Sequence, residues 1–157
     1  SEDAFIDRLF DAAPRHGAPL LAAGVSRAVV DLNRAADELD PALIDGVRRP
    51  VHNPRVASGL GVIPRVVAGG RPIHRGRIAL SEAHGLIEAW WRPYHDTLAA
   101  LLAESHAQFG EAILIDCHSM PHEAIEAHAR PGSPRPEVVL GDRFGAAAGR
   151  DVVERVE

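Results

Sequence analysis

Acidic, imidazole and hydroxyl side chains follow directly after one apolar run. Residues 112–115 are Ala-Ile-Leu-Ile, and Asp116, Cys117, His118 and Ser119 come next. Because side chains alternate between the two faces of a strand, we expect Asp116 and His118 on one face and Cys117 on the other. Imidazole is the commonest metal ligand, and a nearby carboxylate can orient it. The pattern is typical of a metal site, and a buried, hydrogen-bonded His at the end of a strand is the alternative interpretation.

A second group of polar residues follows an earlier apolar stretch. The run 31–34 is Asp-Leu-Asn-Arg, and Arg27 lies just upstream of it. Arginine presents a planar fork that matches a carboxylate, and asparagine adds a donor beside it. Asn33 and Arg34 are therefore candidates for carboxylate binding. A structural ion pair between Asp31 and Arg34 is the alternative.

Tyr94 and His95 lie within a long helical segment, next to Pro93. Tyr94 falls on the apolar stripe of that segment, so we expect it in the core. The position of His95 allows either a structural or a catalytic role. Sequence neighbours on a strand face opposite ways, so Cys117 and His118 do not form a good nucleophile–base pair.

The hydropathy pattern predicts helices that alternate with strands. The N-terminal half is expected to contain a helix over 2–13, one or two strands within 19–34, and an excursion over 40–76 with a short strand near 61–67. A helix over 81–109 follows, which Pro93 kinks or splits in two and Gly110 ends. Strands over 112–115 and 138–140 and a helix over 150–157 complete the chain. This order indicates an α/β fold with a mostly parallel or mixed central sheet flanked by helices. Ligands bind outside the carboxyl ends of strands in such sheets.

Composition excludes several classes of function. The 157 residues carry a net charge of -5, and all 17 basic residues are arginine, which excludes lysine Schiff bases and Walker-type phosphate loops. The negative charge argues against binding to nucleic acid or to a membrane surface. Cys117 is the single cysteine, so an internal disulfide framework and a thiolate zinc cluster are excluded. No leader is visible, so we expect a cytoplasmic protein; no pattern specifies an oligomeric state.

Several short blocks, taken in order, resemble the N-formylglutamate amidohydrolase family. The blocks touch most of the chain: Ser1-Glu2-Asp3 to Leu9, Gly17 to Leu21, Ser26-Arg27, the run 31–34, Gly59 to Arg65, Pro93-Tyr94-His95, the run 116–121, and Leu140-Gly141-Asp142 with Gly145. The resemblance implies a fold and site plan similar to those of the zinc carboxypeptidases.

The resemblance also implies a zinc ion. His118 would be one ligand, and Asp3 or Glu2 would supply another. Bound zinc would lower the pKa of a water molecule and polarise an amide carbonyl. The implied reaction is hydrolysis of an N-acyl acidic amino acid, such as N-formylglutamate, to formate and the amino acid.

Substrate binding is implied for several polar residues. Asn33 and Arg34, together with Arg27 or Arg65, would hold the carboxylates of the small-molecule substrate. Ser119 is assigned to the same task.

Catalytic roles are assigned to Arg27, Asp116 and His95. The family also has a Pro-His-x-Gly stretch that would precede Ser1 and a glutamate that would follow Glu157. We therefore expect residues 1–157 to be a single amidohydrolase-like domain, incomplete at both ends and part of a longer chain.

Two other interpretations of the same residues stay open. A non-catalytic carboxylate-binding module on the same fold is the first, because the upstream histidine and the downstream glutamate of the family lie outside residues 1–157. A structural α/β domain would use His118 only for stability, so that its replacement would change nothing else.

Overall fold

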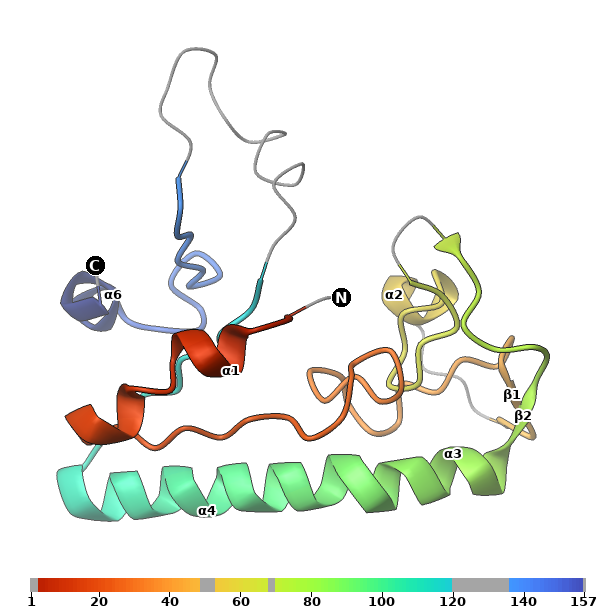
Figure 1. The fold of residues 1–157 in the computed structure, drawn as a ribbon, viewed down its shortest axis with the longest axis horizontal. Coiled ribbons are helices and arrows are strands. Elements are labelled where there is room, and N and C mark those ends of the chain that lie inside the picture. The colour runs from red at the N-terminus through yellow and green to blue at the C-terminus, as the bar shows by residue number, and fades with distance from the viewer. Residues whose placement is uncertain (1–2, 49–52, 68–69, 120–135, 157) are drawn as a thin grey trace, which may run out of the picture. The chain divides into compact units, whose positions relative to one another are not determined.

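The computed structural model describes residues 3–48, 53–67, 70–119 and 136–156. The chain divides into two compact units, Ser1–Cys117 and His118–Glu157. The elements in chain order (Figure 1) are α1 (Ile6–Leu9), the 3-10 helix η1 (Ala13–His16), β1 (Ile44–Asp45), α2 (Pro54–Ala57), β2 (Ile78–Ala79), α3 (Leu80–Leu86), the π-helix η3 (Ile87–Trp91), α4 (Arg92–Phe109) and α6 (Arg150–Val156). The expected single domain over 1–157 stays a prediction.

The core of the first unit lies where β1, β2 and α3 meet. Its fully or almost fully buried apolar side chains are Val30, Leu43, Ile44, Val62, Ile63, Ala83 and Ile87. β1 and β2 are parallel, with Ile44 opposite Ile78 and Asp45 opposite Ala79. The expectation of a mixed α/β fold with parallel pairing is confirmed. The pairing is short, because each of these strands has two residues.

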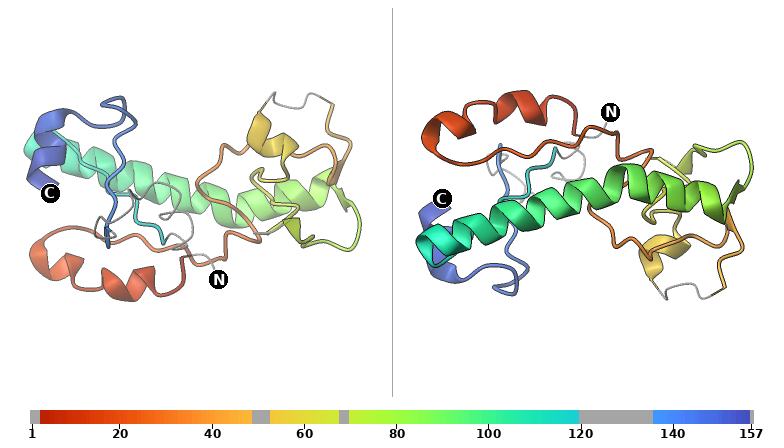
Figure 2. Two further views of the ribbon diagram at one scale, coloured as in Figure 1. Left: turned by 90° about the horizontal axis from the view of Figure 1, so that it is seen from above. Right: turned by 90° about the horizontal axis from the view of Figure 1, so that it is seen from below.

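The helix predicted over 81–109 is confirmed, and Figures 1 and 2 show α3, η3 and α4 as one continuous helix. Gly110 ends it in the left-handed conformation, with φ of 76°, which glycine adopts without steric cost. Pro93 does not split the helix. The Arg92 N–H bonds to the carbonyl of Ile87, five residues back, so the turn before Pro93 is widened. A widened turn gives the proline ring room that a regular turn lacks.

The N-terminal helix is shorter than the predicted range 2–13. Phe5 has a φ of 69° and sits at the N-cap of α1, so regular helix begins only at Ile6. α1 has four residues and buries none of them. Pro14 occupies the first turn of η1, where its missing N–H costs nothing.

The other predicted strands do not form in the described part of the chain. Residues 19–34 and 112–115 have no strand structure, and the same holds for 138–140. Near 61–67 the structure has only an isolated antiparallel bridge between Val66 and Pro72. A strand needs a neighbouring backbone for its hydrogen bonds, and apolar residues alone do not supply one. Ile115, at the end of the predicted strand 112–115, is 58% exposed.

The second unit contains one predicted helix and one tight turn. The helix expected over 150–157 is confirmed as α6, with residue 157 outside the described ranges. The carboxylate of Asp142 accepts hydrogen bonds from the backbone of Phe144 at 3.0 Å and Gly145 at 3.1 Å. Asp commonly stabilises a turn in this way.

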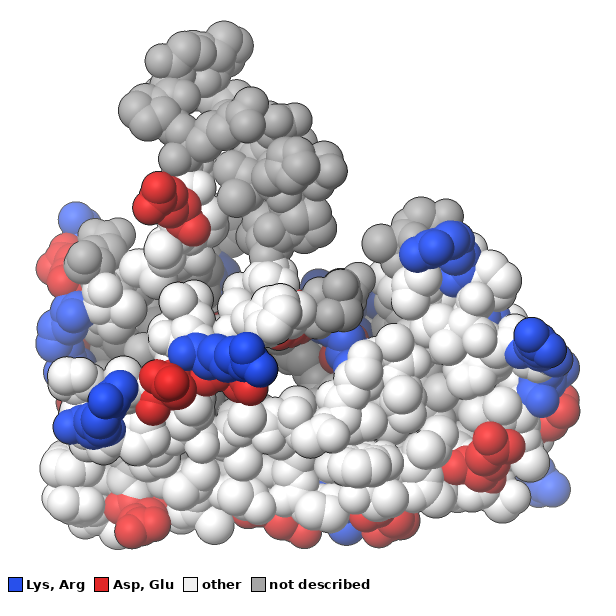
Figure 3. Space-filling model, in the orientation of Figure 1, with Lys and Arg blue, Asp and Glu red and all other residues white. Residues whose placement is uncertain are grey.

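Charged side chains of both signs are scattered over the face that Figure 3 shows, and blue side chains do not gather into one patch there. Among the described residues, no helix combines the length and the apolar character needed to cross a bilayer.

We predict that Gly61→Ala lowers the free energy of unfolding by about 1–3 kcal/mol. A Cβ at this position would overlap the backbone carbonyl oxygen of Glu38, which accepts a hydrogen bond from the N–H of Val62 at 2.9 Å. Gly85 is the matched control, since a Cβ there meets nothing within 4 Å and helical alanine is favoured over glycine by about 0.5–1 kcal/mol. Urea unfolding measures both; equal effects of the two substitutions would contradict the overlap.

Candidate functional site

The run 31–34 is fixed by the buried residue that begins it. Asp31 is 8% exposed, and its backbone N–H donates to the carbonyl of Val62 at 2.8 Å. Its side-chain Oδ1 accepts a hydrogen bond from the backbone N–H of Asn33, two residues further along the chain, at 3.1 Å. This local side-chain bond closes a tight turn without a strand. The turn leaves Asn33 exposed at its tip.

Arg27 bridges two carboxylates that are distant in sequence. Its Nη1 donates to Asp3 Oδ2 at 3.2 Å, and its Nη2 donates to both oxygens of Asp31, at 3.2 and 3.3 Å. Two predicted site residues, Arg27 and Asp3, are therefore in contact. In this arrangement the guanidinium compensates the buried charge of Asp31, as buried charges require.

Arg34 also contacts Asp31, at 3.7 Å, so the structural ion pair considered as an alternative does form. The Nε of Arg34 donates to the carbonyl of Leu60 at 3.2 Å. Its Nη2 makes no hydrogen bond to the residues that the structure describes. One edge of the guanidinium thus holds the fold, while Nη2 can still meet a carboxylate.

Asn33 brings a second predicted residue into the cluster. Its Nδ2 donates to Asp116 Oδ2 at 3.0 Å, across 83 positions of sequence. The two segments predicted to end at one site do meet, although neither ends a strand. Asp31, Arg27, Asn33 and Asp116 form a connected polar cluster.

The long helix supports this cluster through two ring nitrogens. Trp91 Nε1 donates to the carbonyl of Arg34 at 2.8 Å, and His95 Nε2 lies 2.9 Å from the carbonyl of Leu32. The two rings are stacked, with centroids 4.0 Å apart. Both contacts are made to backbone oxygens on either side of Asn33 along the chain.

Tyr94 and Cys117 are held in their neutral forms. Burial raises the pKa of the Tyr94 phenol, and the negative charge of Asp116 raises it further. The same two causes raise the pKa of the Cys117 thiol. Because the thiolate is the nucleophile, the raised pKa works against thiol chemistry at Cys117. A neutral Tyr94 is a hydrogen-bond donor near Asp116.

Arg65 is engaged elsewhere in the first unit. Its Nε donates to Asp40 Oδ2 at 2.8 Å, and Asp40 is only 2% exposed. The other oxygen of Asp40 accepts from the N–H of Ala42 at 2.8 Å. Arg65 therefore neutralises a buried carboxylate, and its role in substrate binding stays a prediction.

The described residues do not by themselves complete a metal centre. They contain no group of three or more His, Cys, Asp or Glu side chains placed to hold a metal ion. Of the three predicted ligands, Asp3 belongs to the first unit and His118 to the second, while Glu2 lies outside the described residues. Ser119 also belongs to the second unit.

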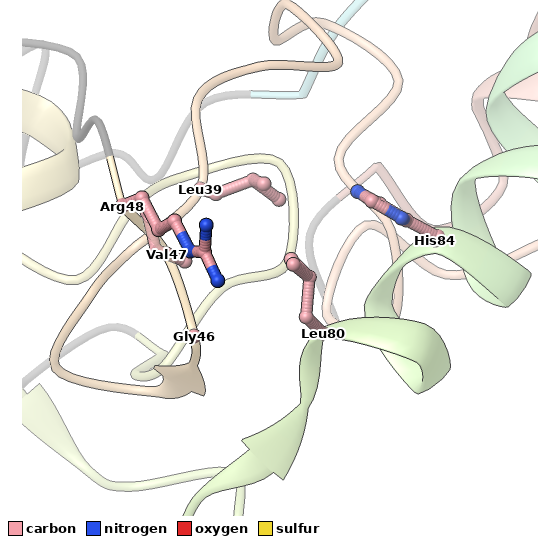
Figure 4. Close-up of a pocket in the computed structure, with 6 residues that line it drawn as sticks. All are labelled: Leu39, Gly46, Val47, Arg48, Leu80 and His84. Carbon is pink, nitrogen blue, oxygen red and sulfur yellow. The ribbon is translucent and has the colours of Figure 1, made fainter.

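The first unit also has a pocket whose lining contains none of the predicted site residues and no member of the polar cluster. Figure 4 shows two of its residues on α3, while the rest come from the chain around β1. Its lining consists of Leu39, Gly46, Val47, Arg48, Leu80 and His84. Its polar side chains are Arg48 and His84, and it has no carboxylate, so we place the candidate site at the polar cluster instead.

The sequence patterns assign no role to Trp91 and do not mark Asp40 as a functional residue. A signal for Trp91 was present, because positions 91 and 95 are four apart and share one face of a helix. Asp40 carried no such signal, since its importance comes from burial and from its contact with Arg65.

The chain is similar to known proteins over its whole length. The model of the family described as N-formylglutamate amidohydrolase matches residues 1–157. The N-formylglutamate deformylases of Pseudomonas aeruginosa and Pseudomonas putida are 35% and 32% identical to the chain, over 99% of it and 53% of their own length. The chain thus spans about half the length of these curated relatives.

A solved structure is also similar. The crystal structure of N-formylglutamate amidohydrolase from Ralstonia eutropha JMP134 matches with a TM-score of 0.87 and 33% identity. The match covers 99% of this chain and 56% of the solved one.

We predict that the phenol of Tyr94 ionises above its usual pKa of about 10. Tyr94 is the single tyrosine, so the rise of tyrosinate absorbance with pH reports it alone. Asp116→Asn removes the charge that contributes to the raised pKa and should lower the midpoint, though not fully, because burial remains. An unfolded chain would ionise first, so stability should fall as pH rises from the usual pKa to the raised one.

Asp96→Asn, on the exposed side of α4, is the matched control and should leave the midpoint unchanged. Circular dichroism at each pH checks that the protein stays folded. A wild-type midpoint at the usual value, or equal midpoints in the two variants, would contradict the placement of Asp116 beside Tyr94.

Proposed function

The chain belongs to the N-formylglutamate amidohydrolase family, and on that premise we propose that the complete protein hydrolyses the amide bond of an N-formyl acidic amino acid, with N-formylglutamate as the first substrate to test. The observation that carries the proposal is the polar cluster, in which Asn33 contacts Asp116, together with Arg34, which Asp31 and the carbonyl of Leu60 hold next to it in the chain. The deformylase names of the two relatives support the choice of substrate.

Recognition of the substrate would rest on the run 31–34. Nη2 of Arg34 would donate to a substrate carboxylate, with Asn33 beside it. The backbone of the run is already fixed by its contacts with Val62 and Trp91, so little ordering would be needed when substrate binds. Arg27 would keep Asp31 neutralised while the site is occupied.

The reaction adds the oxygen of water to the formyl carbon, breaks the C–N bond and transfers a proton to the leaving amine. We assign Asp116 as the group that carries this proton, since a carboxylate can accept it from water and return it to nitrogen. Tyr94, held neutral beside Asp116, would donate a hydrogen bond in the same region.

We propose zinc as the cofactor, with His118 and Asp3 as two of its ligands. Imidazole and carboxylate are donors that zinc accepts, and a catalytic zinc usually takes three protein ligands. Zinc would lower the pKa of a bound water molecule and polarise the formyl carbonyl. The described residues do not complete the set, so further ligands would come from Glu2 or from other parts of the protein.

The architecture proposed for the complete domain is similar to that of the zinc carboxypeptidases. The parallel pairing of β1 with β2 supports it, as does the helix that follows β2 directly. Parallel strands joined through helices are typical of α/β enzymes.

A non-catalytic carboxylate-binding module is the second candidate. One observation favours it: the described residues bring Asn33 and Arg34 into place without gathering a metal centre. Such a module would bind N-formylglutamate and release no formate.

We predict that the complete protein releases formate from N-formylglutamate and that Arg34→Ala raises KM by about 10- to 100-fold. The estimate corresponds to the loss of one hydrogen bond between charged groups. Arg15→Ala is the matched control, because that side chain is 77% exposed and pairs with Asp11 on the surface. Formate release at varied substrate concentration measures KM and kcat.

Binding of N-formylglutamate without formate release, with zinc supplied, would favour the binding module. An unchanged KM in the Arg34 variant would remove Arg34 from the substrate site.

We predict that the complete protein contains zinc and that His118→Ala loses it. Mass spectrometry of the purified protein measures the metal content directly, without an activity assay. His106→Ala, at an exposed position of α4, is the control and should keep full zinc content. A variant at His118 that keeps its zinc but is less stable would show a structural role instead.

A further inference from the structure

We propose that Trp91 and His95 are positioning residues that set the direction in which Asn33 and Arg34 meet the substrate carboxylate. The inference rests on the proposed function, because it concerns the same binding site. It gives His95 a different role from the catalytic one that the sequence suggests.

The two contacts hold the peptide group before Asn33 and the peptide group after Arg34, so together they flank the pair Asn33–Arg34. Trp91 Nε1 donates to the carbonyl of Arg34 at 2.8 Å, and His95 Nε2 meets the carbonyl of Leu32 at 2.9 Å. These two oxygens belong to the residues directly before and after Asn33. Two residues between held peptide groups have little freedom of backbone rotation, which restricts the Cα–Cβ directions of Asn33 and Arg34.

The hydrogen-bond partner of His95 also determines which ring nitrogen carries the hydrogen. A carbonyl oxygen only accepts hydrogen bonds, so Nε2 must carry the hydrogen. In this arrangement Nε2 cannot take a proton from water or substrate. His95 can therefore orient the run 31–34, but its Nε2 cannot serve as the general base.

The aromatic contacts keep both nitrogens in place. The rings of Trp91 and His95 stack at 4.0 Å with an interplanar angle of 30°, and Tyr94 meets His95 edge-on at 5.4 Å. Trp91 is also packed against the hydrophobic core. The position of the run is thus tied to a rigid helix, which places site residues more accurately than a loop alone.

The run is held from a second direction by the loop 60–62. Arg34 Nε donates to the carbonyl of Leu60 at 3.2 Å, and the N–H of Asp31 donates to the carbonyl of Val62 at 2.8 Å. These bonds remain when Trp91 is changed. Loss of the Trp91 hydrogen bond should therefore misdirect Arg34 without unfolding the site.

The first arm of the experiment tests the contact without any substrate. Residues 1–157 contain two tryptophans, and each indole N–H gives its own signal in a nitrogen-15 NMR spectrum of the complete protein. Substitution of single tryptophans assigns these signals and those of any further tryptophans in the complete protein. Trp90 is 41% exposed, and its indole makes no hydrogen bond to the described residues. We expect the Trp91 signal to exchange with deuterium at least about tenfold more slowly than that of Trp90. Equal exchange would overturn the proposal.

The second arm compares Trp91→Phe with Trp90→Phe, the same change one residue away. Phenylalanine keeps a ring that can stack on His95 but removes the N–H. We expect Trp91→Phe to raise KM for N-formylglutamate about tenfold, with kcat within about twofold, and Trp90→Phe to change neither. A fall of kcat with KM unchanged would overturn the proposal.

The third arm tests whether Trp91 acts through Arg34. In a background of Arg34→Ala, Trp91→Phe should raise KM no further than about twofold, since residues that act through one another are not additive. A full tenfold rise in that background would show an independent structural effect.

The experiment also distinguishes a failure of the proposed function from a failure of the positioning role. If the wild-type protein releases no formate, the proposed function fails, and the exchange rates still decide whether Trp91 holds the run. If the wild type is active and Trp91→Phe behaves like Trp90→Phe, only the positioning role fails.

Discussion

The buried carboxylate of Asp31 constrains the whole candidate site. At 8% exposure it must be compensated, and Arg27 and the N–H of Asn33 do this together. Arg27 in turn brings Asp3 to the same place, and the turn that Asp31 closes presents Asn33 to Asp116. Removal of this one charge would release contacts to the N-terminal segment, the turn and the segment before Cys117 at once.

Features of the fold that depend on local sequence could be predicted, and those that depend on distant neighbours could not. The helix ending at Phe109 follows from apolar spacing and from Gly110, and α6 follows from a similarly local pattern. The runs 112–115 and 138–140 have the composition of buried strands, yet composition does not supply the adjacent backbone that a strand requires. The core instead uses residues from the segment 40–76, whose prolines and glycines indicate an excursion with one short strand near 61–67.

The candidate site was predictable in its residue types and partly in its grouping. Carboxylate-binding chemistry at Asn33 and Arg34 follows from the properties of amide and guanidinium groups. The resemblance to the family grouped Asn33 and Asp116 in one site, and a hydrogen bond joins them although neither residue follows a strand. The two hydrogen bonds by which the long helix holds the run 31–34 could not be predicted, because Trp91 and His95 contact backbone oxygens. Every residue has such an oxygen, so no residue type in the sequence marks it as a partner.

The widened turn η3 has a consequence for the register of the long helix. Ala83, Ile87, Trp91 and His95 are spaced by four, and in a regular helix each such step overshoots a full turn by about 40°. Three steps would rotate His95 well away from the face on which Ala83 and Ile87 are buried. A turn that takes more residues to close removes part of this overshoot, so one stripe can enter the core at one end and reach the run 31–34 at the other. The π-helical turn therefore keeps Ala83 and Ile87 on the same face of the helix as Trp91 and His95. Deletion of one residue within 87–91 would rotate the second pair away from the first.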